Sequence, residues 1–330
     1  MTARKRRTIL LAGLIVLGLV GFLTSLLIGP VPTGLSDLWR LVSKGDRDLA
    51  VIVVDLRLSR ALLAFFVGAG LALAGAILQG FFQNPLADPF VLGVSSGSSF
   101  GAVLAIQLGL SVSFAAFSAQ SLFAFVSGLL VVSFIYLLSR RRGVLKVETL
   151  LLTGIALGAL ASALTSFLLF LRTDSFEQAV FWLLGSFALA EWNQVGVVAP
   201  YVLASLLVAQ WLARDMNLLS LGDETARSLG CPVDRVRGGF LVLATILAAS
   251  AVSVSGIIGF VGLIVPHWVR IWIGPDHRHL FPFSALTGGV FLVFCDLAAR
   301  SLLPATELPI GIITAAAGAP FFVYLLHRRS

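Results

Sequence analysis

The chain has 330 residues and a mean hydropathy of +1.00; 58% of its residues are hydrophobic and only 12% are charged. Soluble domains carry about 25% charged residues, so this composition excludes an ordinary soluble protein and indicates a protein that lies in lipid. The net charge of +7 comes from short basic clusters between apolar runs, which are typical of membrane topology signals, and we therefore expect no nucleic-acid partner.

Charge-free apolar segments predict an all-α integral membrane protein with about ten transmembrane helices, because a bilayer core about 30 Å thick needs roughly twenty helical residues to cross it. The expected spans, in chain order, are residues 9–29, 61–80, 93–109, 119–139, 149–171, 194–213, 238–256, 260–271, 281–301 and 309–327. The division of residues 238–271 into two helices is open, because a Gly-rich break in one apolar run also fits a kinked helix. Residues 30–57 are expected to be an outside loop.

The distribution of Lys and Arg predicts that both termini are cytoplasmic. With an even number of spans, the basic clusters at residues 4–7 and 328–329 lie on the same side as the basic loops between later spans. Cytoplasmic loops of membrane proteins carry an excess of these residues, so we expect a multi-pass protein with both ends inside. All spans belong to a single transmembrane domain, residues 1–330.

The cytoplasmic loop 214–238 predicts a structured surface. Ser220 to Asp223 fits a capping box, and Gly230 followed by Pro232 is a helix-stop signal. These signals predict a short helix over residues 221–229 and a second short turn over residues 234–237. An idle linker remains the alternative, but long loops in compact proteins are usually functional, which favours a docking surface for another protein.

Residues that could carry catalysis or hold a metal are scarce. The four histidines form no HExxH motif, and Arg278 between His277 and His279 opposes a bound cation. We therefore expect no catalytic residue, no metal site and no enzyme activity in this chain. There is no GxxxxGK[ST] motif either, so any ATP that drives the protein binds to a partner.

Two further features concern transport. Asp296 and Arg300 lie four residues apart near the outer end of the ninth span and can neutralise each other, which argues against an ion-coupled secondary transporter. The fifth span carries a stripe of small residues at every fourth position. Such a stripe allows close helix packing, and both ordinary packing within the bundle and a face along a translocation path remain open. The stripe consists of Gly154, Gly158, Ser162 and Ser166.

Several long segments in order resemble the FecCD family of binding-protein-dependent ABC importer permeases, which take up ferric siderophores, haem and cobalamin. They are DLRLSRALLAFFVGAGLALAGAILQ (55–79), NPLADPFVLGVSSGSSFGA (84–102), TARSLG (225–230), GFVGLIVPHWVR (259–270) and ELPIGIITAAAGAPFFVYLL (307–326). Cys231 departs from the pattern, because the family often has an aliphatic residue there.

The resemblance implies a type II ABC importer permease fold in a bacterial cytoplasmic (inner) membrane, surrounded by lipid. The implied partners are a second permease copy or a paralogue, separate ABC ATPase subunits that bind ATP and Mg, and a periplasmic or lipid-anchored substrate-binding protein. No cofactor is expected on this chain. Ferric siderophore is the first candidate substrate, with haem and cobalamin as alternatives; bare Fe³⁺ is disfavoured because the spans lack the oxygen ligands it needs.

The resemblance also implies roles for particular residues. The coupling helix that docks on the ATPase would comprise Asp223, Glu224, Arg227, Ser228, Leu229 and Gly230. Arg57, Arg60 and Arg300 would meet acidic residues of the binding protein. They lie at outer helix ends, where a charge can be wet and available, although interfacial anchoring would place arginines there as well. The fifth and tenth spans would line the translocation path, which adds weight to the path reading of the small-residue stripe.

Overall fold

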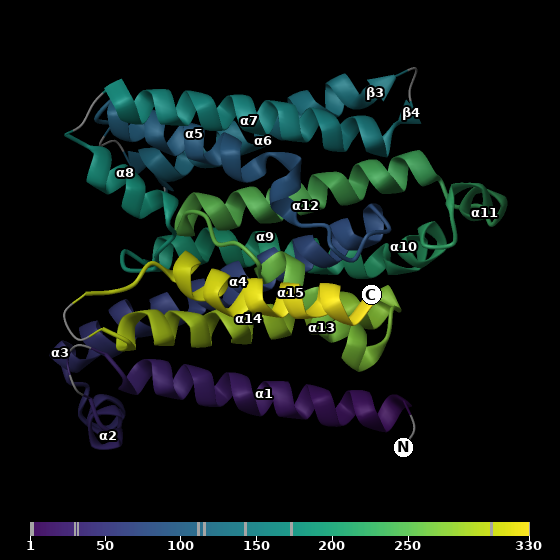
Figure 1. The fold of residues 1–330 in the computed structure, drawn as a ribbon. Coiled ribbons are helices and arrows are strands. Elements are labelled where there is room, and N and C mark those ends of the chain that lie inside the picture. Colours follow the sequence, from purple (N-terminus) through teal and green to yellow (C-terminus); the bar gives the residue numbers. More distant parts are fainter. Residues whose placement is uncertain are drawn as a thin grey trace.

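The helices of the computed structural model lie side by side in a bundle (Figure 1). The structure describes residues 3–29, 31, 33–110, 113–114, 117–141, 144–171, 174–303 and 306–329. Within these residues, seven helices are long and apolar enough to cross a membrane. They are α1 (Ala3–Leu27), α4 (Ser59–Phe81), α6 (Ala119–Ser139), α7 (Val147–Leu171), α9 (Trp192–Trp211), α12 (Val233–Ser255) and α14 (His277–Ser301).

The other three predicted spans are also helical, and two of them, with 14 and 13 residues, are shorter than the seven long helices. They correspond to α5 (Val94–Gln107), α13 (Val261–Ile273) and α15 (Ile310–Arg329). Every predicted span therefore falls on a helix, and the all-α membrane fold is confirmed, with ten as an approximate count. The division of residues 238–271 is confirmed too, because the chain leaves the helix after Ser255 and re-enters it at Val261.

The connection between α4 and α5 explains why α5 is short. This segment folds back into the bundle through a 3-10 turn, η2 (Pro89–Leu92). A Cβ atom on Gly262 would lie 2.7 Å from Cδ of Pro89 and 3.0 Å from the carbonyl oxygen of Leu71, which is near the middle of α4. Because the connection already covers part of the depth of the bundle, fewer residues remain for α5.

The centre of the bundle is α4, while α1 lies at its edge. In the most apolar stretch of each span, 83% of the residues are buried for the segment containing α4 but only 11% for α1. The α4 backbone comes very close to α13, since a Cβ on Gly75 would lie 1.9 Å from the carbonyl oxygen of Gly262. Only glycine permits this approach, so α4 is a packed core helix and α1 presents its apolar side chains outward.

Short elements gather at the two ends of the bundle. At one end, called here the α2 end, lie α2 (Leu35–Lys44), α3 (Arg47–Ala50) and α8 (Phe176–Leu183); the opposite end, called the α11 end, carries α10 (Ala213–Leu219), α11 (Asp223–Ser228) and both termini (Figure 1). A π-helical segment, η1 (Val51–Leu58), leads into α4. The expected outside loop is thus largely helical. Two antiparallel pairs of two-residue strands complete the described structure: β1 (Ser113–Phe114) with β2 (Phe117–Ser118), and β3 (Arg140–Arg141) with β4 (Val144–Leu145).

Two details predicted for the 214–238 loop are wrong, and so is the predicted start of the seventh span. The Ser220 hydroxyl donates to the carbonyl of Met216, 3.0 Å away, and α11 starts after Gly222 without a side-chain cap, so Ser220 forms no capping box. The predicted turn at residues 234–237 is the first turn of α12, and the seventh span consequently begins before residue 238. The predicted short helix between Ser220 and Gly230 is present as α11.

Candidate functional site

A protruding surface at the α11 end is built from α11 and the start of α12 (Figure 1). Ala226 is fully buried and anchors α11 on the bundle, whereas the side chains of Leu221 and Leu229 are 60% and 55% exposed. Gly230 ends the helix with a φ of +83°, a conformation that glycine adopts without strain. Two exposed leucines beside charged groups give this surface the mixed character of a protein interface.

Charged residues on this surface differ in how firmly they are held. Arg237 donates from Nη2 to Oδ1 of Asp223 at 2.8 Å, and this contact joins α11 to α12. Arg227 and Asp234 lie 3.4 Å apart, and about half of each side chain is exposed. An exposed pair of this kind contributes little to stability, so the Arg227 guanidinium is available to a partner.

Each residue predicted for coupling lies on this surface. Glu224, Arg227, Ser228, Leu229 and Gly230 are exposed, whereas Asp223 is half-buried and held by Arg237. Cys231, the departure from the family pattern, is buried just behind the surface. Burial raises the pKa of its thiol, and Asp215 and Asp223 raise it further, so the thiol stays protonated at neutral pH.

The arginines predicted to dock the binding protein lie at the α2 end, but two of them are buried. Arg57 is 5% exposed and Arg300 is 9% exposed. Arg57 donates from Nη1 to the carbonyl of Leu26 at 2.6 Å and to Oγ1 of Thr33 at 2.5 Å, and from Nη2 to the carbonyl of Val31. Arg57 therefore fastens the end of α1 to η1.

Arg60 and Arg300 share the carboxylate of Asp296. Arg60 donates to Asp296 from Nε and Nη2 at 2.8–3.1 Å, and Nε of Arg300 lies 3.7 Å from Oδ2 of Asp296. Nη1 of Arg60 is also 3.0 Å from Glu307, just before α15. Arg300 donates to the carbonyl and the hydroxyl of Ser25 in α1. This network joins α1, α4 and α14 to the start of α15.

The expectation that these arginines are wet and available is wrong for Arg57 and Arg300, because both are buried and bond to backbone carbonyls and hydroxyls of this chain. Their docking role itself stays a prediction. The pairing of Asp296 with Arg300 could be anticipated from their spacing of four residues. The contacts of Arg60 with Asp296 and Glu307 could not be anticipated, because Arg60 lies more than 200 residues from both of them in the sequence.

The small-residue stripe of α7 divides into two parts. Gly154 and Gly158 are buried, and a Cβ on Gly154 would lie 2.8 Å from the carbonyl oxygen of Val91. Ser162 and Ser166 are exposed, and Ser162 donates to Oγ of Ser96 in α5 at 3.2 Å. The glycines thus pack within the bundle, while the serines lie at the border of an exposed apolar face of α7.

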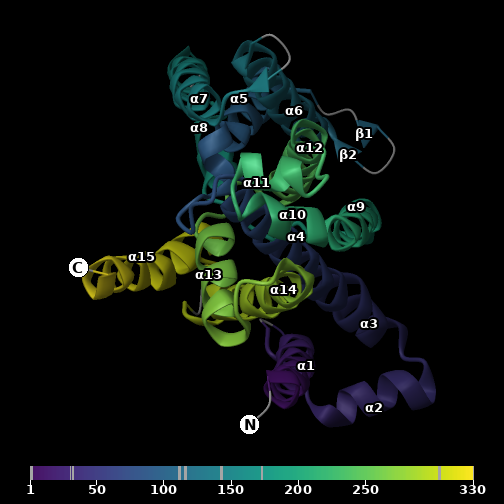
Figure 2. The ribbon, with the colours of Figure 1, turned by 90° about the vertical axis from the view of Figure 1, so that its right-hand side faces the viewer.

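The helix α7 lies on the same side of the bundle as α15, and α9 is on the opposite side (Figure 2). Both helices present large apolar side chains outward: Leu152, Ile155, Leu160 and Phe167 on α7, and Ile312 and Val323 on α15. In the isolated chain these surfaces have the composition of either a lipid-facing surface or a contact with a second membrane subunit.

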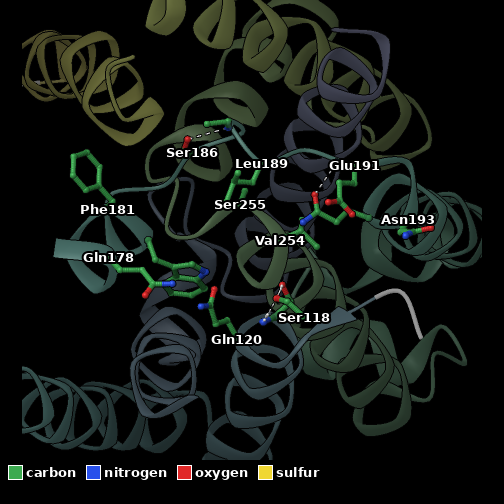
Figure 3. A pocket seen from close by; sticks show the side chains of 14 residues that line it. Ser118, Gln120, Gln178, Phe181, Ser186, Leu189, Glu191, Asn193, Val254 and Ser255 are labelled. Atoms are coloured by element: carbon green, nitrogen blue, oxygen red, sulfur yellow. Dashed lines mark hydrogen bonds between the residues drawn. The ribbon is translucent and has the colours of Figure 1, made fainter. Parts of the chain in front are cut away.

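A polar cavity that sequence reasoning missed opens between α6, α8, α9 and α12. Its volume is about 740 Å³, and amide and hydroxyl side chains form much of its wall, with Trp182 and Leu189 as apolar parts (Figure 3). Glu191 is the one acidic residue among the described residues that line it. Its polar residues come from β2, from the four helices and from the connection between α8 and α9, so no local sequence motif predicts the cavity.

Comparison with known proteins identifies the family. The model of the FecCD transport family matches residues 16–328. The cobalamin import system permease protein BtuC of Halobacterium salinarum is 47% identical over 84% of this chain and 74% of that protein. The hemin transport system permease protein HmuU of Yersinia pestis is 38% identical, with coverage of 100% and 98%.

The fold agrees with this assignment. A solved metal-chelate type ABC transporter in an inward-facing conformation has a TM-score of 0.86 and 35% identity, and the match covers 97% of this chain and 99% of that one. Length, helix arrangement and family motifs therefore agree over almost the whole sequence. The chain belongs to the FecCD transport family and is a permease of an ABC importer.

Proposed function

We propose that this chain carries a metal chelate across the cytoplasmic membrane, driven by a separate ATPase that docks on the α11 surface. The observation that carries the proposal is the exposure of Arg227 on α11 and of Leu221 and Leu229 on either side of it, while α11 itself is anchored by the buried Ala226 and by the Asp223–Arg237 contact. Because the Asp223–Arg237 contact joins α11 firmly to α12, a movement that a partner imposes on α11 is passed on to α12.

The direction of transport follows from the same arrangement. The α11 end carries both termini and the basic clusters, so the positive-inside rule supports a cytoplasmic position for it. The α2 end then faces outward, where a binding protein would deliver the chelate. We further propose that the faces of α7 and α15 line a path shared with a second permease subunit, because both helices lie on one side of the bundle and both expose large apolar side chains.

For docking of the binding protein, we propose that an acidic residue of that protein takes the place of Glu307 on Arg60. The Glu307 side chain is 35% exposed, in contrast to 2% for Asp296, so it is the carboxylate that can move away. Its release would free the start of α15, and this couples docking to a helix beside the proposed path.

Ferric siderophore is the first candidate substrate, as the resemblance implies. The relative named for hemin transport supports an iron chelate. Cobalamin is the second candidate, since a relative named for cobalamin import is 47% identical to this chain. All three candidates are bulky chelates, and an apolar-walled path suits them better than it suits a bare metal ion.

The test is ATP-dependent uptake of labelled ferric siderophore, haem and cobalamin into vesicles that contain this chain, its ATPase and its binding protein. We expect uptake of one chelate, and loss of that uptake in Arg227→Glu with weaker ATPase assembly. Arg47→Glu, the same charge change on an exposed side chain at the α2 end, is the control and should retain assembly. Uptake that continues without the ATPase and follows an ion gradient would refute the proposal in favour of a secondary transporter.

A further inference from the structure

The α2 helix has two fully separated faces. Its apolar residues Leu35, Leu38, Trp39 and Leu41 occupy one side of a helical wheel, and Ser36, Asp37, Arg40, Ser43 and Lys44 occupy the other. Both ends are defined: Oδ2 of Asp37 accepts from the N–H of Gly34 at 2.8 Å, and Gly45 closes the helix in the left-handed conformation with a bond to the carbonyl of Leu41. The segment therefore forms a distinct amphipathic helix with its own end signals.

The apolar side of α2 is only partly covered by the rest of the chain. Leu35 is 66% exposed and Trp39 is 72% exposed, while Leu38 and Leu41 are half-buried. The polar side carries the Asp37–Arg40 ion pair at 3.7 Å. A helix with exposed apolar residues on one side and solvated polar residues on the other has the pattern of a helix that lies at a membrane surface.

The direction of α2 fits the same position. Figure 1 shows α1 lengthwise and α2 end on, whereas Figure 2 shows α1 end on and α2 lengthwise, so α2 lies across the direction of the membrane-spanning helices. It follows directly after the exposed apolar end of α1, where Leu23 and Ile28 are each 45% exposed. The apolar side of α2 is therefore continuous along the chain with the outward, apolar surface of α1.

We propose that α2 lies in the plane of the membrane at the α2 end, with Leu35 and Trp39 inserted among the lipids and Arg40 and Lys44 toward water and the headgroups. Tryptophan is enriched at this level of a bilayer because its ring is apolar and its N–H is polar. The lipid surface thereby helps to hold the α1–η1 connection, which is also held by the hydrogen bonds of Arg57 and of the Thr33 hydroxyl. The inference depends on the membrane-spanning fold and not on the transported substrate.

The experiment places a spin label at one cysteine at a time in the assembled transporter in lipid nanodiscs. Cys231 and Cys295 are both free and buried and are first replaced by serine. Labels go to Leu35 and Trp39 on the apolar side and to Ser36 and Ser43 on the polar side, and collisions with oxygen, which dissolves in lipid, are compared with collisions with a water-soluble nickel chelate.

We expect oxygen to dominate at Leu35 and Trp39 and the nickel chelate to dominate at Ser36 and Ser43, with or without the binding protein. Equal access of the nickel chelate to all four positions would overturn the proposal. Shielding of Leu35 and Trp39 that arises only after the binding protein is added would also overturn it and would assign the surface to a protein partner. Because these are measurements of environment, a loss of uptake in a labelled variant does not affect the conclusion.

Discussion

Asp296→Asn tests whether the buried charge network at the α2 end holds the bundle together. The carboxylate of Asp296 is 2% exposed and faces the guanidinium groups of Arg60 and Arg300. An asparagine keeps the shape but removes the negative charge, so Arg60 and Arg300 remain close together with only the partly exposed Glu307, on Arg60, as a counter-ion. Removing one partner of a buried ion pair costs about 3–5 kcal/mol in the free energy of unfolding.

Glu307→Gln is the matched control, because it removes the other carboxylate bonded to the same arginine. Glu307 is 35% exposed, so solvent screens its charge and the expected loss is about 1 kcal/mol or less. Because both variants replace a carboxylate bonded to Arg60 by an amide, the difference between their losses of stability measures the effect of burial. The double variant Arg60→Gln/Asp296→Asn should lose less stability than the sum of its single changes, since both partners are then gone.

Thermal unfolding in detergent can be followed with a thiol-reactive dye, because Cys231 and Cys295 are free and are 5% and 6% exposed in the folded chain. We expect the midpoint of Asp296→Asn to fall by on the order of 10 °C, and that of Glu307→Gln by a few degrees at most. Equal midpoints for the two variants would refute the argument that burial makes the Asp296 network the main support of this end.

Two further predictions concern the rest of the molecule. Leu229→Asp should abolish uptake and ATPase assembly while leaving the thermal midpoint unchanged, because Leu229 is 55% exposed; a lowered midpoint would show a structural role instead. Glu307→Gln should tighten binding of the substrate-binding protein in a pull-down or titration by freeing Arg60, whereas Glu177→Gln, on an exposed residue at the same end, should not; weaker binding in Glu307→Gln would argue against the exchange.

Local signals in the sequence were sufficient for much of this protein. Apolar runs located the predicted spans, each of which falls on a helix, since a helix needs a long apolar run to cross the bilayer. The helix stop at Gly230 located the end of α11, because a left-handed residue followed by proline cannot continue a helix. The spacing of Asp296 and Arg300 predicted their contact, because residues four apart share one helix face. The family motifs then assigned an ABC importer permease.

Tertiary structure decided the features that join distant parts of the chain. Arg60 meets Asp296 and Glu307 only because α4 packs against α14 and the chain returns to α4 just before α15. The same packing buries Arg57 and Arg300, which their places at helix ends had suggested were exposed. The fold-back of the α4–α5 connection likewise shortens α5. Sequence periodicity reports which side of a helix is apolar, but which neighbour covers that side depends on contacts between residues hundreds of positions apart.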